Sequence, residues 1–378
     1  MSDNNNNYEN IINDIKELSG TISQVSRLQN ALSELSKASN LSANELKKIT
    51  NEAYKLGDSV AKSGSQILEL SAMFKRGGYD IADSMQYAKD ALMTTNISGN
   101  LKDAEQAASC LISIMKDFRN ETPAFAEKIN DSISAVSNTG IIDFDSLIYG
   151  SMQLSATAKQ AGMSFEEMLG TIVGAYEILR DMDMSLSGES EIFSRLQGNS
   201  ANGNSSVYKL QDIYSSSTDG TVNIIDQKSN QLRNVYDILD DLNSVWDTLS
   251  TNTQETLAFE TSGEEYENVF LALMENWNNV EKAVRAATNS FGSAETQNQK
   301  HINSLVGKTE TLQSSLEHLS TTIINSDLLK FFIDLGTVGV SALNTLSSHI
   351  NPLILSFGEL TAFFGRGRLK QRFCPTWM

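Results

Sequence analysis

The side chains that most often carry chemistry are few and scattered in this sequence. The three histidines, His301, His318 and His349, have neither the HExxH arrangement nor the Cys/His spacing that binds zinc. The two cysteines, Cys110 and Cys374, lie far apart, which fits neither a CxxC metal site nor a disulfide framework. His301 and His318 fall on the polar side of an amphipathic pattern, so we expect both to be solvated. The sequence therefore predicts no metal site and no cofactor.

Neighbouring carboxylates could supply an acid and a base, and two such pairs occur. Glu166-Glu167 and Glu264-Glu265 each stand at the start of a predicted helix, where negative charge interacts favourably with the helix dipole. We therefore expect helix capping rather than acid–base catalysis. The glycines form neither GxGxxG nor a phosphate-binding loop with its lysine, and no serine lies in a nucleophile elbow. The sequence does not predict an enzyme.

The most regular pattern lies in residues 293–325, where mainly apolar residues recur at alternating three- and four-residue intervals. We call these positions the seam: Ile302, Leu305, Thr309, Leu312, Leu316, Leu319 and Ile323. The residues between them are mostly polar, so a helix here would be apolar along one stripe only. The spacing predicts one continuous rod of about 50 Å. Such a stripe needs a partner, and self-association of several copies is expected.

Composition indicates a mainly α protein: a multi-helix core with long coiled-coil-like helices and at most one small β-hairpin. Of the 378 residues 40% are hydrophobic, 7% are aromatic and only three are proline, which favours helices over many short strands. The net charge of −18 argues against nucleic-acid binding, since such binding needs Lys and Arg on the contact face. Protein partners are expected instead.

Helix caps, helix-breaking residues and changes of composition along the chain predict five parts. Residues 1–40 form a coiled-coil-like helix, and 41–198 form a helical core with capping boxes at Ser42/Glu45 and Ser164/Glu167. Residues 199–226 form a polar loop followed by a weak hairpin signal, with strands at 207–213 and 221–225 around Asp219-Gly220. Residues 227–325 are helical and end in the seam helix. Residues 326–378 hold an apolar segment and a basic tail.

The last part leaves two questions open. Residues 335–358 have no charged side chain unless His349 is protonated, but they contain many polar residues and Pro352. They fit either a buried or re-entrant helix or a segment that enters a membrane. The tail from Gly365 is basic and without acids, which fits either a membrane-surface tail or the altered end of a longer, truncated reading frame.

Ordered blocks across residues 45–335 resemble the core region of phage tail tape measure proteins. The block before the seam helix, Ser290-Phe291-Gly292-Ser293-Ala294, is the most telling. The other blocks include Phe74-Lys75-Arg76-Gly77-Gly78-Tyr79, Ala161-Gly162-Met163-Ser164-Phe165, Ser194-Arg195-Leu196-Gln197-Gly198 and Phe270-Leu271-Ala272-Leu273-Met274-Glu275-Asn276.

The resemblance implies a structural protein that lies in the lumen of a growing phage tail and sets its length. Its implied partners are other copies of itself, tail tube subunits and tail assembly chaperones, first in the host bacterial cytoplasm and then in the virion. A role in genome delivery is also expected, with host membrane contact through the apolar segment and basic tail of 335–378. The alternatives are a membrane-acting, pore-forming helical protein, and a peptidoglycan-cleaving enzyme, for which no catalytic motif is present.

Overall fold

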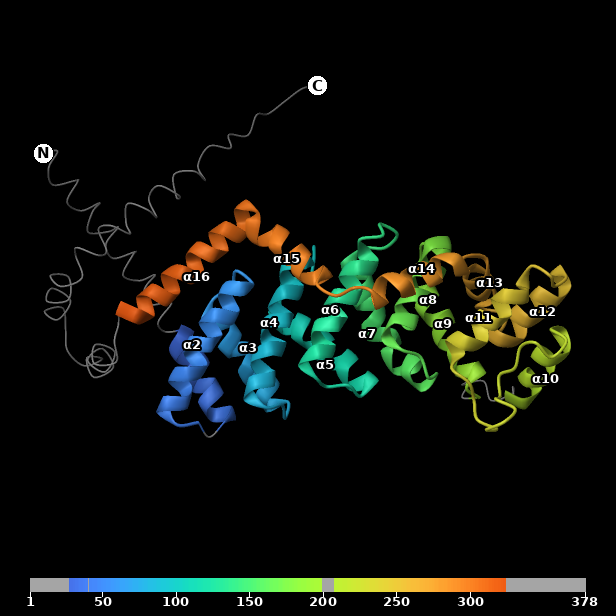
Figure 1. The fold of residues 1–378 in the computed structure, drawn as a ribbon, viewed down its shortest axis with the longest axis horizontal. Helices are drawn as coiled ribbons and strands as arrows, with labels where there is room; N and C mark the ends of the chain where they lie inside the picture. Colours follow the sequence, from blue (N-terminus) through green and yellow to red (C-terminus); the bar gives the residue numbers. More distant parts are fainter. Residues whose placement is uncertain (1–26, 40, 199–206, 324–378) are drawn as a thin grey trace, which may run out of the picture. The chain divides into compact units, whose positions relative to one another are not determined.

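The computed structural model describes residues 27–39, 41–198 and 207–323, and the described chain is predominantly helical (Figure 1). The mainly α prediction is confirmed. The helices are α2 (Ala43–Ser59), α3 (Gly64–Arg76), α4 (Ile81–Ile97), α5 (Ala104–Phe118), α6 (Pro123–Ser137), α7 (Phe144–Gln160), α8 (Phe165–Leu179), α9 (Met182–Leu196), α10 (Val207–Ser217), α11 (Val235–Trp246), α12 (Thr251–Ser262), α13 (Glu267–Glu275), α14 (Trp277–Thr288), α15 (Ser293–Asn303) and α16 (Leu305–Ile323). Of the predicted N-terminal helix, residues 27–38 are helical and residues 1–26 lie outside the described residues.

Local capping chemistry sets many helix starts. Ser42 and Glu45 form the predicted capping box of α2, and Ser164 and Glu167 form that of α8, each satisfying backbone N–H groups that have no partner inside the helix. The hydroxyl of Thr122 accepts from Phe125 N at 3.3 Å, with proline at the first helical position of α6. The two capping boxes predicted from sequence are confirmed.

The predicted hairpin is wrong. Residues assigned to its first strand lie in α10, where Leu210 and Tyr214 are fully buried four residues apart, the spacing of one helix face. The Tyr214 hydroxyl shares a hydrogen bond of 2.8 Å with Thr261 Oγ1 of α12. Within the described residues, the β-structure is limited to an isolated antiparallel bridge between Ile225 and Leu232. The predicted polar loop at 199–206 lies outside the described residues.

Residues Ala31–Ser314 form one compact unit, while 27–30 and 315–323 belong to a second. Within the first unit the chain runs outward through successive neighbours, α2 on α3, α3 on α4, α4 on α5, α5 on α7 and α7 on α8 and α9 (Figure 1). It then returns, because α14 packs on α8 and α6, and α15 packs on α6 and α4. Contacts between residues distant in sequence therefore close the unit.

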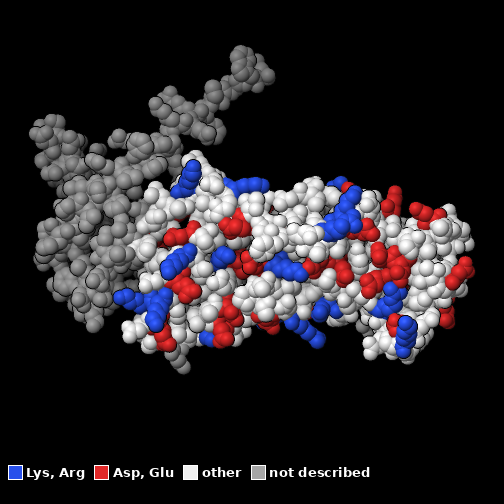
Figure 2. Space-filling model, in the orientation of Figure 1, with Lys and Arg blue, Asp and Glu red and all other residues white. Residues whose placement is uncertain are grey.

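Helix α8 is the centre of this packing. Gly170 and Gly174 face α14, and a Cβ added at Gly174 would lie 2.3 Å from Cγ2 of Val280, so only glycine permits the observed approach. On the outside of the first unit, acidic and basic side chains intermingle over the face shown in Figure 2. The core is thus tightly packed and mainly apolar, although a few acidic side chains, among them Asp131 and Glu189, are buried in it.

Candidate functional site

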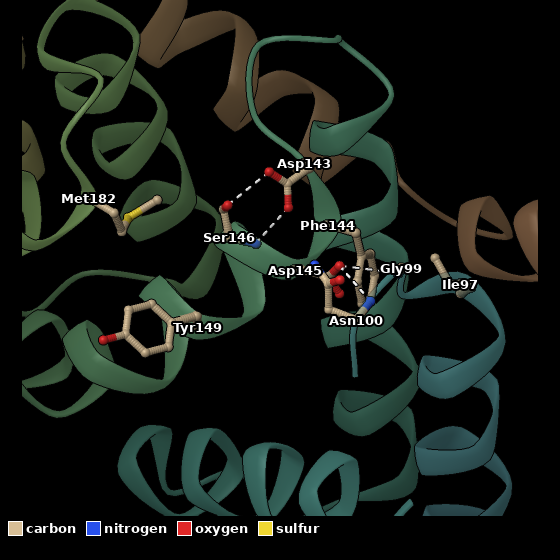
Figure 3. A pocket seen from close by; sticks show the side chains of 9 residues that line it. All are labelled: Ile97, Gly99, Asn100, Asp143, Phe144, Asp145, Ser146, Tyr149 and Met182. Atoms are coloured by element: carbon tan, nitrogen blue, oxygen red, sulfur yellow. Dashed lines mark hydrogen bonds between the residues drawn. The ribbon is translucent and has the colours of Figure 1, made fainter. Parts of the chain in front are cut away.

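A pocket of about 600 Å³ lies beside the start of α7, and both of its carboxylates already have structural partners (Figure 3). The Asp145 carboxylate accepts from Gly99 N at 3.1 Å and from Asn100 N at 3.0 Å, and Ser98 Oγ donates to it as well. Asp143 caps α7 by accepting from Ser146 N at 2.8 Å. Both carboxylates therefore hold backbone in place. The pocket does not bring together an acid, a base and a nucleophile.

The seam is the candidate functional site, and the structure divides its helix. The predicted single rod over 293–325 is wrong, because Ser304 has extended backbone angles (φ −69°, ψ 165°) between α15 and α16. The Ser304 hydroxyl accepts from Gly307 N at 3.1 Å and so caps the second helix. A serine at this position can end one helix and start another without changing the apolar periodicity.

Seam side chains in the first unit are only partly covered. Ile302 and Leu312 are half-buried, while Thr309 is exposed and Leu305 is 84% exposed. Val306, next to the seam, is 61% exposed. The backbone of Leu316, Leu319 and Ile323 is helical, but their side chains lie outside the described set. The expectation that this stripe associates with another copy stays a prediction.

Helix α15 is fixed at its N-terminus by a buried carboxylate of α6. The two oxygens of Asp131 accept from Gly292 N and from Ala294 N, each at 2.9 Å. Asp131 is 4% exposed, and it satisfies N–H groups at a helix start, where negative charge is favourable. The seam region is thus attached to the unit through its first turn.

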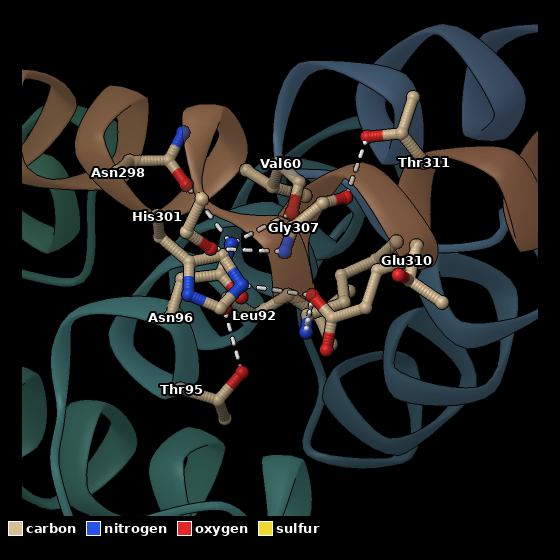
Figure 4. Close-up of polar contacts among 12 residues, drawn as sticks. Val60, Leu92, Thr95, Asn96, Asn298, His301, Gly307, Glu310 and Thr311 are labelled. Atoms are coloured by element: carbon tan, nitrogen blue, oxygen red, sulfur yellow. Dashed lines mark hydrogen bonds and ion pairs between the residues drawn. The ribbon is translucent and has the colours of Figure 1, made fainter. Parts of the chain in front are cut away.

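A buried amide pair fixes the middle of α15 (Figure 4). Asn298 is fully buried, and its amide donates to Ser59 O at 3.1 Å. Its side-chain oxygen accepts from Asn96 Nδ2 at 2.9 Å, and the Asn96 amide also donates to Val60 O at 2.7 Å. Asn96 and Asn298 thereby join α4 and α15 to the end of α2. No local sequence signal identifies this pair.

A charged cluster joins the two sides of the break at Ser304 to the α2–α3 turn. The Glu310 carboxylate lies 2.8 Å from His301 Nε2 (Figure 4). It also lies 2.9 Å from Lys62 Nζ. Burial raises the pKa of Glu310, but hydrogen bonds from His301 and Lys62 outweigh burial and hold that pKa below its usual value. The prediction that His301 is solvated is wrong, because its side chain is only 17% exposed. His349 lies outside the described residues.

Two acids inside the unit have roles that were not anticipated. Glu166, expected only to favour a helix start, also forms an ion pair with Lys128 of α6. Glu189 of α9 is fully buried, and neither carboxylate oxygen has a hydrogen-bond partner among the described residues. Burial raises the pKa of Glu189 to about 8, with a weaker opposing effect of Thr171, whose hydroxyl donates to Met168 O. The position of Glu189 between Leu186 and Phe193 on an apolar face could have indicated its burial.

The described chain is thus a helical protein whose candidate site is the attached, partly exposed seam. Among described residues, no group of three or more His, Cys, Asp or Glu side chains could hold a metal ion. The chain belongs to the phage-related minor tail protein family, whose model matches residues 50–261, more than half of the 378 residues. It therefore has a structural role in a phage tail, and the resemblance stated from sequence is confirmed.

A curated relative supports the same conclusion. A protein of Escherichia phage P2 described as "Probable tape measure protein" is 25% identical over 153 residues, which are 40% of this chain and 18% of that protein. The match therefore spans less than a fifth of the relative's length. No solved structure matches the chain. None of the described helices has the length and apolar character needed to cross a membrane, and residues 335–358 lie outside the described residues.

Proposed function

We propose that this chain acts as a tape measure in phage tail assembly, occupying the tail lumen while tube subunits polymerise around it. Its partners in this role are further copies of itself, tail tube subunits and tail assembly chaperones. Assembly takes place in the host bacterial cytoplasm, and the protein remains in the virion tail.

The observation that carries the proposal is the exposed seam on a chain of the minor tail family. Leu305 is 84% exposed at the start of α16, which leaves an apolar position of a heptad pattern without cover in the first unit. Heptad stripes bury such positions by pairing with an equivalent helix. The similarity to the phage P2 protein supports the same role.

Self-association can be tested on the full chain. Removing residues 316–322 deletes one heptad of α16 and keeps the register of the remaining positions. We expect a lower mean mass in light scattering across a concentration series. The matched control, Lys308→Ser, changes an exposed residue outside the seam and should leave the mass unchanged. Equal masses for the deletion and the natural chain would contradict self-association through the seam.

Length determination can be tested by electron microscopy of tails assembled in the bacterial host. Four extra heptads in the seam helix add 28 residues, so we expect tails longer by about 42 Å at a rise of about 1.5 Å per residue. The same 28 residues inserted at 199–206, between α9 and α10, provide the control and should not lengthen the tail. Tails of unchanged length after the seam insertion would exclude the tape measure role.

Genome delivery is a second part of the proposal, and it rests on the sequence of 335–378. An apolar segment followed by a basic tail favours contact with an anionic membrane surface. We expect leakage from vesicles of bacterial anionic lipids with the full chain, and none after residues 335–378 are removed. Intact vesicles in both cases would exclude membrane permeabilisation by this segment.

A further inference from the structure

The apolar pattern of the seam continues through the break between α15 and α16. Ile302 precedes the break at Ser304 by two residues and Leu305 follows it by one, yet their spacing of three is the one a continuous heptad requires. Leu305 and Thr309 then keep the next spacing of four. A straight helix through Ser304 would therefore join both parts into one stripe, whereas the bent form divides it.

The contact between His301 and Glu310 is specific to the bent form. His301 and Glu310 are nine residues apart and lie 2.8 Å from each other. In a continuous helix, nine residues span about 13.5 Å along the axis and end on the opposite side, so these side chains could not meet. Their bond to each other, the bond from Lys62 to Glu310 and the bond from Ser314 Oγ to Lys62 O at 2.9 Å hold the bend closed against the α2–α3 turn.

Gly307 is the second requirement of the bend. A Cβ added there would lie 2.1 Å from the backbone oxygen of His301 and 2.7 Å from Cα of Ile302. These atoms belong to backbone and cannot rotate away. In a continuous helix, residues 301 and 307 do not approach in this way, and alanine is favoured over glycine. Glycine at 307 therefore permits the bent form at the expense of the straight one.

We propose that the α15–α16 bend is a switch that controls the seam. In the separate chain, the bend is closed by His301, Glu310 and Lys62 and the stripe is interrupted. When a second copy of this chain pairs with it, α15 and α16 straighten into one helix, and Leu305 joins the continuous stripe between the copies. The occupant is a second copy because the same three–four spacing lets two identical stripes interdigitate. This regulation rests on the proposed self-association.

The test measures a distance across the bend in the full chain. Cys110→Ser and Cys374→Ser first remove the native thiols. Nitroxide labels are then attached at Thr296→Cys and Gln313→Cys, two exposed positions, and the distance between the two labels is measured. A straight helix separates the labelled backbone positions by about 26 Å, and any bend shortens this distance. In dilute wild type we expect the short distance, with the long one appearing as concentration rises.

Gly307→Ala should shift the population to the long distance in dilute protein and raise the mean mass, while Lys308→Ala, its exposed neighbour, should change neither. A folded Gly307→Ala protein that keeps the short distance would overturn the switch. If it straightens but remains monomeric, Gly307 sets the bend, but the proposed pairing of two seams fails. His301→Ala removes the bent-specific bond without introducing a clash, so it should shift the population toward the long distance should Gly307→Ala not fold, and an unchanged distance in a folded His301→Ala protein would count against the switch.

Discussion

The side chains of Asn96 and Asn298 meet at 2.9 Å although they are 202 residues apart in the sequence. Asn298 is fully buried, and its amide also donates to Ser59 O. A buried polar group that loses its partner keeps its desolvation cost, so this pair matters more than its single hydrogen bond suggests.

Asn298→Ala should therefore lower the free energy of unfolding by about 1–3 kcal/mol, because it leaves Ser59 O and Asn96 Nδ2 with one partner fewer. Urea denaturation followed by circular dichroism measures the change. Lys300→Ala, an exposed position on the same helix, is the control and should stay within about 0.5 kcal/mol of wild type. Equal midpoints for the two variants would show that the amide pair contributes nothing.

Glu189→Gln should change how stability depends on pH. The pKa of Glu189 is raised from 4.5 to about 8, so the folded state retains the proton over a range in which the unfolded chain loses it. The free energy of unfolding contributed by Glu189 therefore falls as pH rises through this range, by at most about 1.4 kcal/mol per pH unit. Glutamine has no proton to lose and avoids this decrease.

The difference in unfolding free energy between Glu189→Gln and wild type, measured in urea from pH 5 to pH 8, should consequently grow with pH in favour of the variant. Glu105→Gln replaces an exposed carboxylate on α5, and its difference from wild type should stay flat. A flat curve for Glu189→Gln would mean that the buried carboxyl titrates normally. Asp90, whose burial raises its pKa to about 7, adds a similar trend to both proteins and cancels in the difference.

Gly174→Ala should destabilise the contact between α8 and α14. The new methyl would lie 2.3 Å from Val280 Cγ2, and overpacking of this kind costs about 1–3 kcal/mol. Val280→Ala removes the obstructing methyls and by itself leaves a small cavity. The double variant should lose less stability than the sum of the single losses. Additive losses in thermal or urea unfolding would show that the two residues do not compete for the same space.

Leu305→Ser should separate stability from association. The side chain is 84% exposed, so the free energy of unfolding should change by no more than about 0.5 kcal/mol. If the seam pairs with another copy, the same change should lower the mean mass in light scattering. Thr309→Ser, a polar exchange at an exposed seam position, is the matched control and should preserve both quantities. A large loss of stability in Leu305→Ser would mean that the residue belongs to the core.

Local signals predicted much of the fold. The capping boxes at Ser42 and Ser164 depend on side chains within three residues of the backbone they satisfy, so the sequence alone identifies them. The hairpin was predicted because β-branched residues flank Asp219-Gly220. The four-residue spacing of Leu210 and Tyr214 instead favours a helix, and this helix is stabilised by packing of both buried residues in the core beside α12.

The candidate site was predicted only in part. The spacing of Ile302, Leu305 and Leu312 identified a helical stripe. The break at Ser304 leaves that spacing intact, so the apolar periodicity could not predict the break. What holds the bend is a contact of Glu310 with Lys62, 248 residues away, and such a pairing has no local signature. Long-range partners act together with the local cap at Ser304 and the glycine at 307 to set where this helix stops.

The hydrogen bond from Asn298 to Ser59 O has one more consequence, because it brings two points 239 residues apart to within 3.1 Å. The segment from residue 59 to residue 298 therefore begins and ends at nearly the same point, whatever its number of residues. If the protein sets the length of a tail, the number of residues between Ser59 and Asn298 would not determine that length. The helices that determine it would then lie outside this stretch.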